Sequence, residues 1–412
     1  MAKALAWGAV GLALSIAVTP PVLGEELGSC GVCHSLVKQA FLDSAHAQKG
    51  MICATCHGGN PADAQSTAMA PAAGFKGRPS RRQIPALCAS CHSDPKRMQP
   101  YGLPTDQFAE YQLSRHGWAL ARGDARTAVC TDCHTTHHIL PPDSPRSTVS
   151  PGNSPGTCAR CHADEKRIAA YGLPADEYAE YVGSVHALAL VEGGNPSAPS
   201  CVSCHGSHGP LPPGVQDIGH TCGQCHAQEQ RALMKGPHGR PAAAGRMELC
   251  TSCHQGHGTQ SAQPAMLTSA CRACHGPGSS ASMQGAALLG EIASAQKALA
   301  TAGRALLRAE AAGWPVEDLP QRLRQAQGDL VQTAPAQHSM IPGDVQAHTA
   351  RALQAAGVIA RELAELARRE RWRDLALAVL CAAVAVITGS LYLKRRRPRL
   401  PALEGGSEGA QR

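Results

Sequence analysis

The sequence predicts a mainly α-helical protein with extensive irregular loops and little or no sheet. Three observations lead to this prediction. Aromatic residues make up only 3% of the 412 residues, too few for an ordinary packed core of this size. The chain also contains nineteen cysteines and twenty histidines, so something other than side chains is expected to fill part of the interior. After about residue 280 the cysteines almost stop, and apolar residues recur with a helical period.

The first segment, residues 1–24, predicts a secretory signal peptide. Lys3 is followed by an apolar run that ends at Val18, and by proline and small residues up to Gly24. A retained membrane helix is the alternative, but the run is short and ends in Thr-Pro-Pro. The mature chain is therefore expected to work outside the cytoplasm.

Nine C-x-x-C-H motifs follow in residues 25–279. Their cysteine pairs are Cys30/Cys33, Cys53/Cys56, Cys88/Cys91, Cys130/Cys133, Cys158/Cys161, Cys201/Cys204, Cys222/Cys225, Cys250/Cys253 and Cys271/Cys274. The histidines that follow directly are His34, His57, His92, His134, His162, His205, His226, His254 and His275. Only Cys381 lies outside the motifs.

This motif is typical of covalent haem attachment. Two thiols three positions apart can form thioether bonds with the two haem vinyl groups, and the adjacent imidazole becomes the proximal iron ligand. A disulfide scaffold or a set of zinc ribbons would not require histidine after every cysteine pair. We therefore expect nine covalently bound haem c groups, attached through all eighteen motif cysteines and ligated by the nine motif histidines.

Eleven further histidines are available as second axial ligands. Three follow a motif histidine by three positions, and four others precede a motif in the contexts SAH, SRH, SVH and GPH. This recurrence predicts the distal ligands His46, His116, His137, His186, His208, His238 and His257, with His220 and His348 completing the set. His338 is an alternative to His348, and His138 is interpreted as a neighbour of His137.

The second motif departs from this pattern because Asn60 stands where other blocks have a histidine. Two alternatives remain for its iron. It is open, or its distal ligand is a distant histidine or a methionine, with Met51 and Met69 as nearby candidates.

An internal repeat of about seventy residues organises this region. The segments beginning at Cys88 and Cys158 share the pairs Lys96/Lys166, Tyr101/Tyr171, Pro104/Pro174, Tyr111/Tyr181 and Ser114/Ser184. Such duplication predicts a run of similar modules that bury their faces against neighbours and against haem.

Residues 280–373 predict a helical bundle or hairpin. The apolar seams are Leu288, Ile292, Ala295, Leu299, Ala302 and Leu306; Val316, Leu319, Leu323, Ala326 and Leu330; and Val345, Ala352, Ala356, Ile359, Leu363 and Leu366. Residues 374–393 then predict one transmembrane helix, and residues 394–412 a basic cytoplasmic tail.

The formal charge of +7 does not indicate a nucleic-acid partner. Each ferric haem with two ionised propionates adds about −1, so nine haems would make the external part negative.

The motifs, the recurring ligand histidines and the repeat resemble the multihaem c-type cytochromes of anaerobic respiration. The resemblance is to the low-potential bis-histidine cytochromes and to the related NapC/NirT/NrfH-type quinol dehydrogenases. It implies electron transfer between the quinol pool of the cytoplasmic membrane and periplasmic or outer-membrane partners. The partners implied are periplasmic cytochromes or an integral-membrane quinol-oxidising subunit. The location implied is the inner membrane, with a single span and the main domain in the periplasm.

An enzyme acting on a small nitrogen or sulphur compound at one open haem is the alternative function. No motif has lysine in place of the proximal histidine, as the dedicated nitrite-reducing haem of such enzymes does. A third hypothesis is that the protein is a subunit of a quinol dehydrogenase.

Overall fold

The computed structural model describes residues 27–209 and 218–396, which form helices and irregular loops with no strand. The predicted signal peptide (residues 1–24), the side chain of His220 and residues 397–412 of the predicted tail lie outside this description. The mainly helical fold is confirmed, since 65% of the structure is helical.

The chain divides into two compact units. Unit 1 comprises Met1–Cys225 and Glu248–Ser261, and unit 2 comprises His226–Met247 and Ala262–Arg412. Seven complete motifs thus fall in unit 1, whereas the last motif, Cys271–His275, lies on the same unit as the helical bundle.

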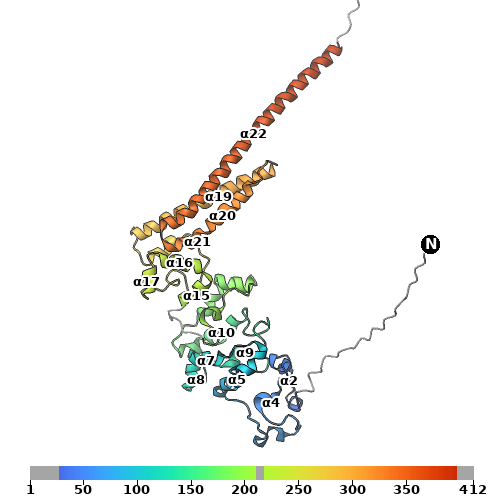
Figure 1. The fold of residues 1–412 in the computed structure, drawn as a ribbon, viewed down its shortest axis with the longest axis vertical. Coiled ribbons are helices and arrows are strands. Elements are labelled where there is room, and N and C mark those ends of the chain that lie inside the picture. The colour runs from blue at the N-terminus through green and yellow to red at the C-terminus, as the bar shows by residue number, and fades with distance from the viewer. Residues whose placement is uncertain (1–26, 210–217, 397–412) are drawn as a thin grey trace, which may run out of the picture. The chain divides into compact units, whose positions relative to one another are not determined.

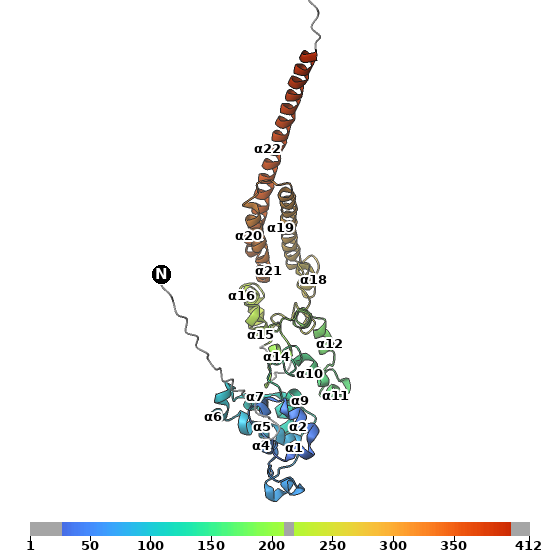
Figure 2. The ribbon, with the colours of Figure 1, turned by 90° about the vertical axis from the view of Figure 1, so that its right-hand side faces the viewer.

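Unit 1 consists of short helices joined by loops (Figures 1 and 2). Its α-helices are α1 (Cys30–Cys33), α2 (Ser35–Leu42), α3 (Ala45–Gln48), α4 (Cys53–His57), α5 (Ile84–His92), α6 (Pro95–Met98), α7 (Gln107–Leu113), α8 (Arg115–Ala121), α9 (Cys130–His134), α10 (Ser154–His162), α11 (Glu165–Ala169), α12 (Glu177–Val182), α13 (Val185–Ala187), α14 (Cys201–His205) and α15 (Ile218–Cys225). The other helical turns of unit 1 are η1 (Ser66–Met69), η2 (Pro71–Ala73), η3 (Arg81–Gln83), η4 (Gln99–Tyr101) and η5 (Leu188–Glu192).

The seventy-residue repeat is visible in the hydrogen bonds of unit 1. The Tyr111 hydroxyl donates to the Ala128 carbonyl, and the Tyr181 hydroxyl donates to the Pro199 carbonyl, both at 2.8 Å. Each bond ties the tyrosine helix to the loop that leads into the next motif. Equivalent tyrosines in the two copies therefore stabilise equivalent loops.

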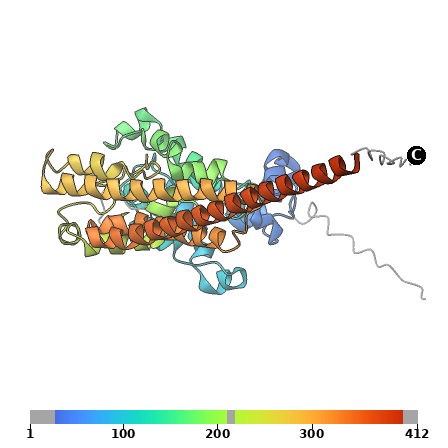
Figure 3. The ribbon, with the colours of Figure 1, turned by 90° about the horizontal axis from the view of Figure 1, so that it is seen from above.

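Unit 2 contains a bundle built on three helices. Its elements are α16 (Ala227–Lys235), α17 (Gly239–Ala243), α18 (Met266–Arg272), α19 (Ser280–Ala311), α20 (Leu319–Val331), α21 (Thr333–Ala336), η6 (Gln337–Ser339) and α22 (Pro342–Arg396). Helices α19 and α20 both pack along the first part of α22 (Figure 3). The predicted helical region is thus a packed bundle.

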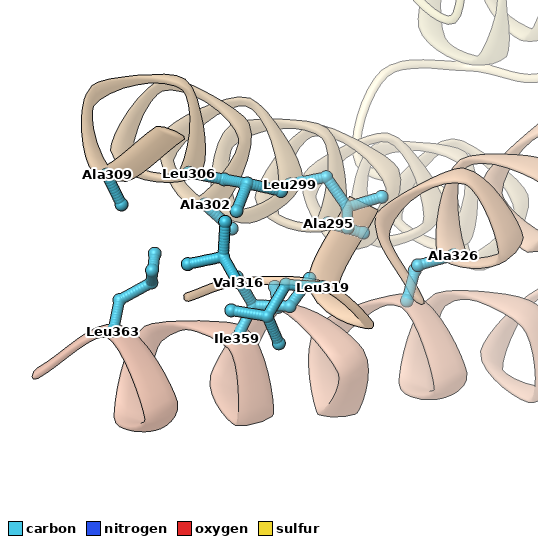
Figure 4. Packing of buried hydrophobic residues seen from close by; sticks show 12 residues of the cluster. Ala295, Leu299, Ala302, Leu306, Ala309, Val316, Leu319, Ala326, Ile359 and Leu363 are labelled. Carbon is cyan, nitrogen blue, oxygen red and sulfur yellow. The ribbon is translucent and has the colours of Figure 1, made fainter. Parts of the chain in front are cut away.

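The predicted seam residues form the core of this bundle. Leu299, Leu306 and Ile359 are buried and lie between α19 and α22, with Val316 and Leu319 beside them (Figure 4). Leu323, Leu330 and Leu366 are partly buried at its margin. The helical period of the sequence therefore identified which residues face the core.

Gly285 fixes the contact between α19 and α18. A Cβ atom at this position would lie 2.1 Å from the Leu267 carbonyl oxygen, so no larger residue fits without displacing the backbone. The Cys271 sulphur is also close, 3.4 Å from that point. This close approach connects the ninth motif to the bundle.

Helix α22 continues far beyond the bundle (Figure 1). Its side chains are buried only as far as Leu363, and the apolar stretch that follows, which contains Cys381, is exposed. Among the described residues α22 is the one helix long and apolar enough to be a candidate membrane span. The predicted span of residues 374–393 is thus the continuation of the last helix of the bundle.

Candidate haem-binding sites

Six motif histidines each face a second histidine from another part of the chain. The facing pairs, with their ring-centroid distances, are His46 and His92 (6.0 Å), His57 and His137 (6.2 Å), His116 and His162 (6.2 Å), His134 and His208 (6.1 Å), His205 and His257 (5.9 Å), and His238 and His275 (6.1 Å). Every pair joins one C-x-x-C-H histidine to one of the predicted distal ligands.

This spacing fits two imidazoles that bind one metal from opposite sides. A metal–imidazole bond is about 2 Å long, and the ring centre lies about 1 Å beyond the nitrogen, so the two centroids should be about 6 Å apart. Direct stacking of two rings would bring them closer, at about 4.5 Å when offset. The space between the rings is therefore the size that one ligated iron requires.

Two of the leading histidines are placed by a serine that starts their helix. The Ser44 hydroxyl accepts a hydrogen bond from the Ala47 backbone N–H at 3.1 Å, and the Ser114 hydroxyl accepts from Gly117 at 3.0 Å. Both serines are buried N-caps, and the ligand histidine follows two positions later in each helix. Ser184 caps α13 in the same way before His186. The S-x-H pattern is thus a helix start that fixes the histidine.

The trailing histidines are placed by a reversal of the chain. The motif helices α4, α9 and α14 end at residues with positive φ, which are Gly58 (67°), Thr135 (68°) and Gly206 (83°). Threonine rarely adopts this conformation. Its hydroxyl donates to the His138 carbonyl at 2.7 Å, which stabilises the turn. The turn carries His137 away from its own motif.

The pairs follow two interleaved patterns. His46 and His116, which precede a motif, face the histidine of the second motif that follows them, His92 and His162. The trailing histidines face backward instead. His137, His208 and His257 each face the motif histidine two motifs before their own.

The pairing of His57 with His137 bears on the alternatives for the second motif. A distant histidine faces His57, so the structure favours that alternative over an open iron or a methionine ligand. Asn60 instead accepts a hydrogen bond from the Ala62 backbone N–H at 3.1 Å, which makes it a turn residue.

Consecutive motifs are neighbours in unit 1. Side-chain hydrogen bonds join Cys88 to Cys130, Cys158 to Cys201, and Cys222 to Cys250. Other thiols lie close enough to interact electrostatically, namely Cys30 with Cys53, Cys56 with Cys91, Cys133 with Cys161, and Cys204 with Cys222. The first eight motifs therefore follow one another in space in the order of the sequence.

The eighth motif has one of its cysteines at the protein surface. Its second cysteine, Cys253, is exposed, whereas Cys250 is partly buried. This motif forms a turn instead of a helix. The Cys253 and His254 backbone N–H groups both donate to the Cys250 carbonyl, at 3.2 and 2.9 Å. The thioether bond of Cys253 to haem stays a prediction.

The same exposure recurs at other motifs. In each case the second cysteine of the pair is exposed and the first is partly buried. The exposed second cysteines are Cys33, Cys56, Cys225, Cys253 and Cys274. In these five pairs the first cysteine is therefore less exposed than the second.

The environment of the paired imidazoles favours the neutral form that binds a metal. Burial, followed by the facing histidine, lowers the pKa of His46, His116 and His137. Burial lowers the pKa of His134 to about 4, with His208 as the next cause. The His57 Nδ1 lies 3.0 Å from the Gly77 carbonyl oxygen, a contact that orients the ring and leaves Nε2 to bind.

One cavity tests whether the residues around a motif fit a haem. A cavity of about 550 Å³ lies beside Cys161. Its lining includes four basic side chains, Arg81, Arg126, Lys166 and Arg167, and two acidic ones, Asp132 and Asp164. Haem carries two carboxylates, and guanidinium groups are suited to bind carboxylates. Arg81 also forms a salt bridge to Asp132, which fixes its position beside the fourth motif. The size of the cavity and its excess of basic side chains therefore fit a haem and its carboxylates.

Two carboxylates near distal histidines were not identified from the sequence. Glu110 Oε2 lies 3.9 Å from His208 Nδ1, and Glu180 Oε2 lies 4.0 Å from His257 Nδ1. The two glutamates occupy equivalent positions of the seventy-residue repeat. Their duplication was a signal that could have found them. A carboxylate at this position increases the basicity of a metal-bound imidazole.

The remaining histidines are placed differently. His138 Nε2 contacts Asp43 at 2.9 Å, and Arg146 binds the same carboxylate, which agrees with a neighbour role. His348 Nδ1 lies 2.7 Å from an Arg351 nitrogen, and His338 Nδ1 lies 2.9 Å from the Ala334 carbonyl oxygen. His186, His220 and His348 stay predictions as distal ligands.

Neither alternative to haem is supported by the described residues. The motif cysteines there form no disulfide, unlike those of a disulfide scaffold. Within the same residues no group of three or more histidine, cysteine, aspartate or glutamate side chains is arranged to hold a metal ion, as a zinc ribbon would require.

Comparison with known families gives one match. The family model described as cytochrome c3 matches residues 45–163, less than a third of the chain. This stretch contains four of the nine motifs and three of the paired distal histidines, His46, His116 and His137. Searches of curated proteins and of solved structures found no match. The match supports covalently bound c-type haem in several copies.

Proposed function

We propose that this multihaem c-type cytochrome carries nine haems and conducts electrons between the quinol pool of the cytoplasmic membrane and periplasmic or outer-membrane partners. Bound haem supplies a one-electron iron couple, and the family match supports electron transfer as the general role. The proposal is that the nine motifs act together as one conducting chain.

The spatial order of the motifs is the observation that carries this proposal. Neighbouring motifs in the sequence bring their thiols together from Cys30 to Cys250, without a gap in the series. A protein that used one haem for chemistry would not need eight sites that follow one another closely in space. A chain of sites suits transfer over a distance.

The paired histidines would set the redox properties. Two imidazoles keep iron six-coordinate and give a lower potential than a methionine–histidine pair. They also exclude substrate from the metal. The repeated pairs, such as His46 with His92 and His116 with His162, therefore support a carrier rather than a catalyst.

Helix α22 supports attachment to the membrane. Its apolar stretch follows four arginines that include Arg371 and Arg373, and it is followed by Lys394, Arg395 and Arg396. The proposed arrangement is a single span with the haem region in the periplasm, which rests on the sequence prediction of a signal peptide. The proposed partners are periplasmic cytochromes and a quinol-oxidising membrane subunit.

The proposal is tested by adding a menaquinol analogue to membranes that contain the full-length protein. The expected result is reduction of the haems, seen as a rise of the ferrous α-band. A chain that ends after Arg373 should keep the haem spectrum but appear in the soluble fraction and lose rapid reduction. Full-length protein that stays oxidised while dithionite reduces it would contradict the quinol-linked role.

A further inference from the structure

The first motif differs from five other motifs of unit 1. Five motif histidines of that unit, at positions 57, 92, 134, 162 and 205, have a second imidazole ring opposite them, and they are partly buried. His34 is exposed, and none of the other histidine rings among the described residues is found opposite it.

The segment around His34 is nevertheless firmly placed. His34 stands between α1 and α2, and its carbonyl accepts the Lys38 backbone N–H at 2.8 Å. Ser29 anchors the start of α1, because its backbone N–H donates to the Pro61 carbonyl at 2.8 Å. His34 therefore lacks a facing imidazole ring although backbone hydrogen bonds hold its motif in place.

The nearest unused histidine of this region is engaged elsewhere. His138 lies close to α2, where its Nε2 contacts Asp43 at 2.9 Å, and Arg146 holds the same carboxylate at 2.8 Å. A ring nitrogen that donates its proton to a carboxylate has no lone pair to give to iron. His46 and His137, which flank this ion pair in sequence, already face His92 and His57.

The surroundings of the first motif are open to solvent. Val32 is 76% exposed and Leu36 is 88% exposed, so no described segment covers these side chains. The aliphatic stem of Lys38 lies against Gly31, within the motif itself. Its ammonium group adds a positive charge near the site.

We infer that the iron bound by Cys30, Cys33 and His34 keeps its second axial position open and binds a small exogenous iron ligand there. The class is that of diatomic molecules and small anions, for which an exposed site is accessible and a nearby lysine is favourable. The inference rests on the proposed haem content. It places the open iron at the first motif, whereas an open iron at the second motif was one of the alternatives that the sequence left.

Carbon monoxide is the probe, because it binds ferrous haem only where a position is open or a ligand leaves. The full-length protein is reduced with dithionite and titrated with carbon monoxide while the Soret band is recorded. We expect one carbon monoxide per protein at saturation. A second sample of the same protein is assayed for total haem as the pyridine complex.

Two variants identify the iron that responds. The double replacement Cys30→Ala and Cys33→Ala should lower the haem count by one and abolish carbon monoxide binding. The matched replacement Cys271→Ala and Cys274→Ala, which removes the site of the His238 and His275 pair, should lower the count equally but leave binding intact. The variant His34→Met keeps both cysteines and tests the same site in case the double replacement misfolds. It should alter the spectrum of the carbon monoxide complex. The matched variant His275→Met should leave that spectrum unchanged.

The outcomes separate the inference from the proposed function. Nine haems without carbon monoxide binding would overturn the open site and leave the conducting chain intact. Binding that persists in the Cys30 and Cys33 variant, with an unaltered spectrum in His34→Met, would place the open iron elsewhere and also overturn it. A protein with no covalent haem would contradict the proposed function itself.

Discussion

The imidazole rings of His134 and His208 lie parallel to within 8°, with their centroids 6.1 Å apart. They come from different copies of the repeat and from different motif blocks. Burial lowers the pKa of both histidines, and for His134 the facing His208 is the next cause. Two neutral imidazoles held at this separation form a preorganised site for one iron.

Removing a distal histidine should open one iron. His137→Ala removes the ring that faces His57 and should convert one haem from low spin to high spin. His138→Ala is the matched control, because the adjacent histidine contacts Asp43 instead. The measurement is the high-spin ferric signal in the electron paramagnetic resonance (EPR) spectrum. An equal signal from both variants would contradict the assignment of His137.

The carboxylates beside the distal histidines should tune the potential. Glu110→Gln removes a negative charge 3.9 Å from His208 Nδ1 and should raise one reduction potential by tens of millivolts. A tenfold change in relative affinity for the two iron states corresponds to about 59 mV for one electron. Glu180→Gln should act likewise through His257. Spectropotentiometric titration measures the shift, and Glu165→Gln, an exposed change in the same repeat, should produce none.

Asp43 should make stability depend on acidity. Hydrogen bonds from Arg146 and then His138 lower its pKa from 3.8 to about 2. Because the pKa is lower in the folded state, the stabilisation is present above pH 3.8 and is lost as the pH falls toward about 2. The effect is modest, since the carboxylate is solvent-exposed and salt screens it.

The check is the urea midpoint across this pH range. Asp43→Asn should unfold at lower urea than the unchanged protein above pH 3.8, and the difference should shrink as the pH approaches about 2. The control is Asp143→Asn, which changes an exposed aspartate in the loop after His138. A difference that stays constant with pH would refute this role for Asp43.

The bundle core should carry the stability of the C-terminal helices. Ile359 of α22 is completely buried in the bundle core, and its truncation to alanine should cost about 2–5 kcal/mol of unfolding free energy. Leu307→Ala, at a side chain that is 65% exposed, should cost far less. Urea unfolding followed by circular dichroism compares the two. Similar losses in both variants would rule out the seam as the core.

Much of the fold was predictable because it follows local periodicity. Leu288, Ile292 and Leu299 recur at helical spacing, and all three are buried. The S-x-H pattern also has a local cause, since Ser44 and Ser114 start the helices that carry the histidines. These features depend on neighbours in the sequence and need no knowledge of the tertiary structure.

The pairing of histidines was not predictable for a physical reason. His57 meets His137, and His134 meets His208, through chain reversals at Thr135 and Gly206 that bring remote segments together. The spacing of residues along the sequence does not show which remote segment brings a second histidine to a given motif histidine. The same limit explains why the sequence left alternatives open for the iron of the second motif and why Glu110 was missed.

The exposure of Cys253 was not predictable from its motif either. All nine motifs have the same C-x-x-C-H spacing, yet the eighth forms a turn where others, such as Cys130–His134, form a helix. The C-x-x-C-H sequence indicates which residues can bind haem. Whether a given thiol lies at the surface depends on the segments that pack around it.

The most direct test is a quantitative EPR spectrum of the fully oxidised protein. The account predicts low-spin signals from eight irons with two axial histidines and a high-spin signal that integrates to one iron per protein. The high-spin signal should vanish in the variant with Cys30→Ala and Cys33→Ala. High-spin iron in several copies would contradict the histidine pairs on which the account depends.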